Sequence, residues 1–119
     1  MAMTEMNYVS GGGSSEPIEF TSVLSSNGGV VFDTESVNSV LIKFTGRDGS
    51  GDTVRVNVSN SPYTTAKDMY HYGTNVKNFS SIMSDYVDLL ALSEVSGYRY
   101  IGLNSDRSSS MTIVETKIS

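Results

Sequence analysis

Apolar and polar residues alternate along two segments near the middle of the chain, at 37–45 and 53–59. In the second segment valine occupies every second position from Val54 to Val58, and polar residues fill the positions between them. Successive side chains of a β-strand point to opposite faces, so this alternation predicts two strands that each bury one face. Residues 46–52 between them are rich in Gly, Asp and Ser, which suit a tight reversal. We therefore expect the two strands to form an antiparallel hairpin.

Other short segments have the same strand-like character and are separated by turn-forming residues. We expect further strands at 17–24, 30–32, 98–103 and 111–118. The sequence indicates the secondary structure less clearly for three segments, at 63–72, 76–83 and 87–92. Apolar residues in the last two recur at the spacing of a helix as well, so periodicity alone does not distinguish the two structures. We favour strands because the segments are short and the first is rich in Thr and Tyr, although a short helix within 62–97 stays open.

Together these segments predict an all-β domain of about eight short strands. Turn signals at this spacing are typical of an antiparallel β-sandwich or a jelly roll. We expect this domain to occupy residues 16–119. With 119 residues in the chain, it is large enough to bury a hydrophobic core without disulfides or metals.

The first fifteen residues differ from the rest and are expected to form a flexible N-terminal arm. Residues 1–10 have no clean periodicity, and residues 11–15 have the Gly/Ser composition of a flexible linker. One interpretation is a disordered terminus that need not be native. The other is an arm that orders when it docks on a neighbouring subunit. Its anchors would then be the apolar residues Met3, Met6, Tyr8 and Val9.

Composition and charge exclude several classes of function. The chain has no cysteine, so it has no disulfide framework and no thiolate metal site. Its net charge is −5 and its eight basic residues are scattered, which argues against nucleic-acid binding. No apolar stretch is long enough to cross a bilayer, and the first ten residues lack the features of a signal peptide. We expect neither a nucleic-acid nor a membrane partner.

One loop has a faint resemblance to a calcium site. Asp48, Ser50 and Asp52 place oxygen atoms at alternate positions, as calcium-binding loops do. An EF-hand-type loop would also need Gly at the position of Thr53 and a bidentate Glu at that of Ser59, and the match fails at both. We therefore favour an ordinary connecting loop, with weak calcium binding as the alternative and no other metal site expected.

Catalytic chemistry has little support in the sequence. His71 is the single histidine, and Asp68 is its one neighbour at a spacing that suits metal ligation. No Gly-x-Ser-x-Gly motif precedes a helix, so no nucleophile elbow is indicated. We expect no enzyme activity and no cofactor.

The strongest candidate for a binding surface is a cluster of aromatic residues. Its members fall within ten positions and are Tyr63, Tyr70, His71 and Tyr72. In a strand, Tyr70 and Tyr72 would share one face. Such faces anchor protein interfaces and also stack on sugar rings. Ordinary packing is the third interpretation.

Two resemblances add expectations. The segments 97–103, with Arg99-Tyr100-Ile101, and 111–118, with Glu115, resemble the last two strands of galactose-binding-like (discoidin-type) jelly rolls. That resemblance implies a jelly roll and assigns no binding residue.

The chain as a whole resembles small structural proteins of tailed bacteriophages. The shared features are a Met-rich arm, a Gly/Ser linker and a β-domain without Cys or Trp. The resemblance implies a non-enzymatic virion protein, assembled in the host cytoplasm, that decorates a capsid or belongs to a tail or fibre. Its partners would be other virion proteins and further copies of itself. The alternative is a carbohydrate-binding module or receptor-binding fibre domain that uses the tyrosine-rich segment.

Overall fold

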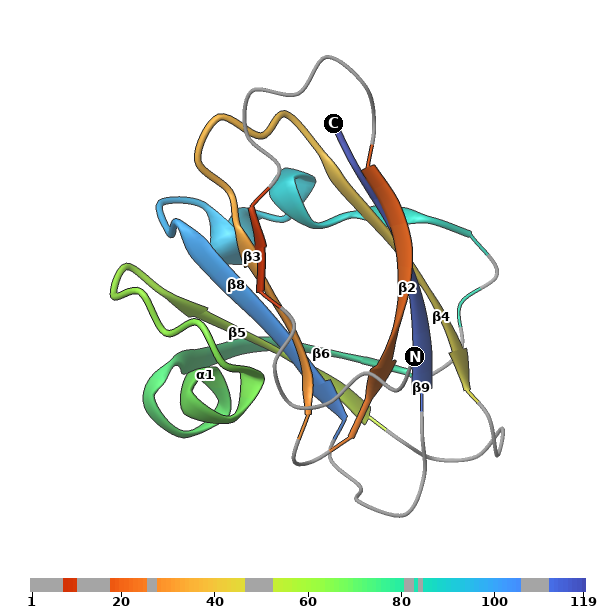
Figure 1. The fold of residues 1–119 in the computed structure, drawn as a ribbon, viewed down its shortest axis with the longest axis horizontal. Helices are drawn as coiled ribbons and strands as arrows, with labels where there is room; N and C mark the ends of the chain where they lie inside the picture. Colours follow the sequence, from red (N-terminus) through yellow and green to blue (C-terminus); the bar gives the residue numbers. More distant parts are fainter. Residues whose placement is uncertain are drawn as a thin grey trace.

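Two β-sheets packed face to face make up most of the protein, as the computed structural model shows (Figure 1). The structure describes residues 8–10, 18–25, 28–46, 53–80, 83, 85–105 and 112–119. One sheet has the strand order β1 (Tyr8–Ser10), β3 (Gly29–Asp33), β8 (Tyr100–Ser105), β5 (Thr53–Ser59), β6 (Thr74–Ser80). The other has the order β2 (Ile18–Leu24), β9 (Thr112–Ile118), β4 (Val40–Gly46), β7 (Val87–Asp88). The predicted all-β sandwich is confirmed.

The order of the strands is that of a jelly roll. From β2 to β9, successive strands belong to the two sheets in turn, except that β5 and β6 are neighbours in the same sheet. The last two strands insert between earlier ones: β9 lies between β2 and β4, and β8 lies between β3 and β5. These interleaved Greek keys define the eight-stranded jelly roll. β1 adds a ninth strand at the edge, where it pairs in parallel with β3, whereas the other pairs are antiparallel.

The hydrophobic core lies between the sheets and follows the predicted alternation. The inward residues of β5 are Val54, Val56 and Val58, and each is at most 1% exposed. From the other sheet, Ile42 and Phe44 of β4 meet them in the same core.

The pairing expected for these two strands is wrong. β4 hydrogen-bonds with β9 and β7, whereas β5 hydrogen-bonds with β8 and β6, so the two strands belong to different sheets. Alternation identifies the buried face of a strand and does not identify its neighbour. β4 and β5 therefore do not form a hairpin with each other.

The segment 63–72 is a second correction, because it contains a helix. Helix α1 (Ala66–Tyr72) follows Thr65, whose hydroxyl oxygen accepts a hydrogen bond from the Asp68 amide at 3.0 Å. Such an N-cap satisfies one of the free amides of the first turn. The helix ends at Gly73, whose amide donates to the Met69 carbonyl at 2.9 Å.

The other two ambiguous segments differ from each other. The segment 76–83 lies largely in strand β6, as predicted. The segment 87–92 has two strand residues in β7 and then a 3₁₀ turn, Leu89–Ala91, so the longer strand expected there is wrong. The Asp88 carboxylate ends the strand because it accepts from the Leu90 amide at 3.0 Å and caps the turn.

Helix α1 covers the outer face of the five-stranded sheet (Figure 1). Its Ala66 and Met69 are fully buried against Val31 of β3 and Tyr100 of β8. Gly102 lies under the helix, and a side chain there would clash with Met69. The glycine therefore permits the close approach of helix and sheet.

A buried amide on the sheet fixes the end of the helix. Asn57 is 1% exposed, and its Nδ2 donates to the carbonyls of Met69 and Tyr70 at 3.0 and 3.3 Å. Its Oδ1 accepts from Nδ2 of Asn75 at 3.1 Å. Asn57 thus gives the Tyr70 carbonyl, near the end of the helix, a side-chain donor, and adds a second donor to the Met69 carbonyl, which also accepts from the Gly73 amide.

Candidate functional site

The four aromatic side chains predicted as a binding surface come together at the last turn of α1, and we call them the aromatic ridge. The ridge consists of Tyr63, Tyr70, His71 and Tyr72. Ring centroids lie 5.7 Å apart for Tyr63 and Tyr72, 6.3 Å for His71 and Tyr72, and 5.4 Å for Tyr70 and His71. Each ring thus contacts the next, at separations typical of aromatic pairs.

The ridge combines exposed and supported rings. Tyr72 is 68% exposed and His71 is exposed, whereas Tyr63 and Tyr70 are half-buried. Tyr63 packs against the buried cluster under α1. The guanidinium of Arg55, on β5, lies 5.1 Å from the centroid of the Tyr70 ring. The outer rings therefore rest on groups that the sheet holds in place.

The grouping was predicted, but its geometric reason was wrong. The expected strand placed Tyr70 and Tyr72 on one face, whereas both residues lie in the last turn of a helix. The ridge forms because Tyr63, ahead of the helix, meets Tyr72 at its end.

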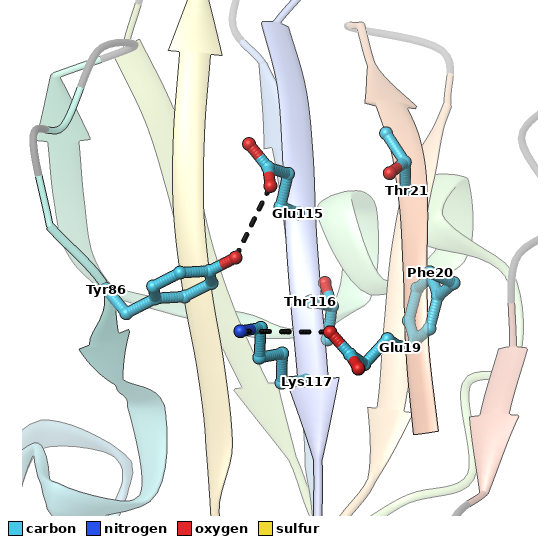
Figure 2. Close-up of a pocket in the computed structure, with 7 residues that line it drawn as sticks. All are labelled: Glu19, Phe20, Thr21, Tyr86, Glu115, Thr116 and Lys117. Carbon is cyan, nitrogen blue, oxygen red and sulfur yellow. Dashed lines mark hydrogen bonds and ion pairs between the residues drawn. The ribbon is translucent and has the colours of Figure 1, made fainter. Parts of the chain in front are cut away.

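A second candidate site lies on the outer face of the four-stranded sheet. A trough with a volume of about 190 Å3 crosses β9 there. Figure 2 shows the side chains that line it. Its lining residues come from β2, β9 and the residue before β7. They are Glu19, Phe20, Thr21, Tyr86, Glu115, Thr116 and Lys117.

Strand register explains which polar groups meet in the trough. Glu19 lies beside Lys117 in the pairing of β2 with β9, and the Lys117 Nζ is 3.7 Å from a Glu19 carboxylate oxygen. The Tyr86 hydroxyl donates to a Glu115 carboxylate oxygen at 3.3 Å. The ammonium groups of Lys117 and Lys43 lie 4.7 and 5.9 Å from the Tyr86 ring centroid.

The trough was not predicted from the sequence. Its charged residues occupy the outward positions of strands that were expected, so the pattern marked them as exposed. They come together because β2 pairs with β9, and these two strands lie far apart in the sequence. The alternation of side chains contains no information about such distant pairing.

Arg99, part of the galactose-binding-like resemblance, has a structural ion pair. Its Nε and Nη2 donate to the two Asp33 carboxylate oxygens at 2.8 and 2.9 Å, and Nη1 lies 3.1 Å from Glu35. Asp33 is 5% exposed. The hydrogen bonds to Asp33 hold the pKa of Arg99 above its usual value, so this group stays charged. The ion pair joins the start of β8 to the end of β3.

Several predicted residues lie outside the described part of the chain. They are Met3, Met6, the linker at 11–15 and the calcium candidates Asp48, Ser50 and Asp52. Tyr8 and Val9 lie in β1, beside Val31 and Phe32 of β3. The arm at 1–15 and the docking of its anchors stay predictions.

Two kinds of feature are absent from the described residues. Among them, no three side chains of His, Asp or Glu lie close enough together to hold a metal ion. In the same ranges, no helix combines the length and the apolar character needed to cross a bilayer.

The aromatic ridge and the trough are thus two candidate binding surfaces in the described part of the chain. The ridge offers exposed rings on a fixed support, and the trough offers charged and hydroxyl groups around a small hollow. Comparison with protein-family models, with curated proteins and with solved structures finds no match to this chain.

Proposed function

We propose that this protein is a non-enzymatic structural component of a bacteriophage virion, which binds neighbouring virion proteins through the aromatic ridge. It would decorate a capsid or belong to a tail or fibre, in the particle and not on a membrane. The observation that carries the proposal is the exposure of Tyr72, at 68%, beside His71, which is also exposed.

The support beneath the exposed rings favours a binding role. Tyrosine is enriched among the residues that dominate interface energies. Tyr72 contacts Tyr63, and the helix that carries it is fixed by Met69 and Asn57. A ridge that is already ordered loses little conformational entropy when a partner covers it.

Repetition in a particle makes a small contact sufficient. A virion presents many copies of its proteins, and linked contacts reinforce one another through effective concentration. Jelly rolls occur in viral capsids and in lectins, so the fold is compatible with the proposal without deciding it.

Glycan stacking is the alternative use of the same rings. The exposed Tyr72 ring offers a flat apolar face, which is the surface that a pyranose needs. A carbohydrate-binding module or receptor-binding fibre domain would use the ridge in this way.

Occupancy of the particle tests the proposal. The genome that encodes the protein is prepared with the wild-type gene, with Tyr72→Ala and with Tyr98→Ala, and the copies on purified particles are counted by mass spectrometry. Tyr98 is the matched control because it is also exposed, at 37%, and lies outside the ridge. We expect Tyr72→Ala to reduce occupancy by at least about tenfold, the effect of an interface hot spot.

Two results would overturn the proposal. The first is absence of the wild-type protein from the particles. The second is full occupancy by the Tyr72→Ala variant. A glycan array with the same three proteins separates the alternative, since saturable binding that Tyr72→Ala abolishes, with unchanged occupancy, assigns the ridge to a sugar.

A further inference from the structure

The trough lies on the four-stranded sheet, whereas the aromatic ridge belongs to α1 and the residues ahead of it. Figure 1 shows α1 packed against the other sheet. We propose that the trough is a separate binding site, which takes one neutral pyranose ring of a glycan. The site uses no residue of the ridge, so it does not depend on the proposed role of the protein in a virion.

The walls of the trough face each other across β9. Glu19 and Thr21 of β2 form one wall, Tyr86 forms the other, and Glu115 and Lys117 rise from the floor between them (Figure 2). Every one of these side chains ends in a group that donates or accepts a hydrogen bond. A ligand in the trough is therefore surrounded by polar partners on three sides.

These polar groups are only loosely engaged with one another. Strong charge-assisted hydrogen bonds have lengths of about 2.7–2.9 Å. Here the Lys117–Glu19 pair is at 3.7 Å and the Tyr86–Glu115 bond is at 3.3 Å. The side chains of Glu19 and Lys117 are 65% and 44% exposed, so solvent has access to both. Ligand hydroxyls can replace such solvent contacts without breaking a tight protein bond.

The balance of charge indicates a neutral ligand. Glu19 and Glu115 line the trough together with Lys117, and the Lys43 ammonium lies near the same tyrosine ring. The two carboxylates of the lining oppose an anion, whereas Lys117 in the lining and Lys43 beside the Tyr86 ring oppose a cation. A hydroxyl group suits both kinds of neighbour, because it donates to a carboxylate and accepts from an ammonium.

The Tyr86 ring gives the trough an apolar side. Its hydroxyl donates a long hydrogen bond of 3.3 Å to Glu115, and the ammonium groups of Lys43 and Lys117 lie 5.9 and 4.7 Å from the ring centroid. A pyranose has both hydroxyls and an apolar C–H surface, which correspond to the two kinds of lining. The volume of about 190 Å3 is below the roughly 300–1,000 Å3 of sites for drug-sized molecules and suits a single ring.

The test is a titration of the full-length, nitrogen-15-labelled protein with methyl glycosides of galactose, glucose and mannose, followed by NMR. We expect saturable shifts for at least one of them at residues 19–21, 86 and 115–117. Galacturonate and galactosamine are the charged probes, and we expect them to bind at least about tenfold more weakly than the best neutral sugar.

Substitutions locate the binding. Glu115→Gln and Lys117→Met should each weaken the sugar by at least about tenfold, because each removes a charged hydrogen-bonding partner. The matched controls are Glu94→Gln and Lys77→Met, which alter a similar exposed ion pair outside the trough. Tyr72→Ala is the third control and tests the ridge. All three controls should bind as the wild type does, and the NMR spectrum of each variant reports its folding.

Several outcomes would contradict the site. Absence of saturable shifts with all three neutral sugars overturns it, as does equal or tighter binding of a charged probe. Shifts confined to the ridge, or binding lost in Tyr72→Ala and kept in Lys117→Met, would move sugar recognition to the ridge and reject the trough.

Discussion

The outer faces of the two sheets have opposite surroundings, although one chain builds both. β3 and β8 are buried along their whole length, and α1 packs on the side of them that does not face the core, over Val31, Tyr100 and Gly102. β9 buries every second residue and leaves the residues between them partly exposed. The difference teaches that a strand with apolar or small residues on both faces requires another element packed on its outer face. A strand with charged residues on one face can leave that face exposed to solvent.

The residues at the centre of each face explain the contrast. Under the helix lie Val31 and Gly102, which are small and apolar and leave room for Met69. At the centre of the open face lie Glu115 and Lys117, whose charges keep water in contact with the sheet. Burial of those charges would cost more than packing a helix there would gain.

The largest expected effect on stability comes from weakening the packing of α1 on the five-stranded sheet. Met69→Ala should reduce the free energy of unfolding by about 3 kcal/mol, because Met69 is fully buried between the helix and the sheet. The matched change on the open sheet is Leu41→Ala, which should cost about 1 kcal/mol or less since Leu41 is only partly buried. Urea denaturation measures both values. Equal losses in the free energy of unfolding for Met69→Ala and Leu41→Ala would show that the packing of α1 adds no more stability than the open face does.

A smaller effect, of opposite sign, is expected on the inner side of the open sheet. Thr116 is 1% exposed, and its hydroxyl oxygen has no hydrogen-bond partner among the described residues. Thr116→Val keeps the shape and removes the unpaired group, so we expect a gain of about 1 kcal/mol in the free energy of unfolding. Thr45→Val, on the exposed side of β4, should change it by no more than about 0.5 kcal/mol. A loss of stability in Thr116→Val would indicate that the hydroxyl is satisfied.

The smallest effect concerns the edge of the covered sheet, at β6. A backbone hydrogen bond and Lys77, at 3.3 Å, lower the pKa of Glu94 from its reference value of 4.5. A lowered pKa stabilises the fold above the unfolded value, and that contribution disappears as the pH falls from 4.5 through the folded value. Lys77→Met should therefore make stability slightly less dependent on pH in this acidic range, and Lys43→Met on the open sheet is the control. An identical pH profile in wild type and Lys77→Met would mean that the ion pair makes no contribution.

The strands could be predicted because their signal is local. Alternation in 53–59 identified β5 and its buried face, and the same holds for β4. Their partners could not be predicted, because each pairs with strands distant in the chain. Thus the sandwich followed from the sequence, whereas the jelly-roll order came from the structure.

Helix α1 was missed although the sequence held its signals. Thr65 followed three positions later by Asp68 is a common start of a helix, and Ala66 and Met69 have the spacing of one helical face. The tyrosines, which favour strands in general, outweighed these signals and led to the wrong prediction. The ridge residues were nevertheless found, because their proximity in sequence brings them together in either structure. The trough was missed because its residues meet only after β2 pairs with β9.

The position of β9 has a consequence for how the protein acquires its structure during synthesis. β2 and β4 both use β9 as a neighbour and have no pairing with each other. Until residues 112–118 have left the ribosome, the four-stranded sheet has a gap at its centre, and both flanking strands expose unpaired edges. Such edges invite association with other chains. Folding of this half is thus completed only after residues 112–118 have been made, and pairing over such long separations is intrinsically slow.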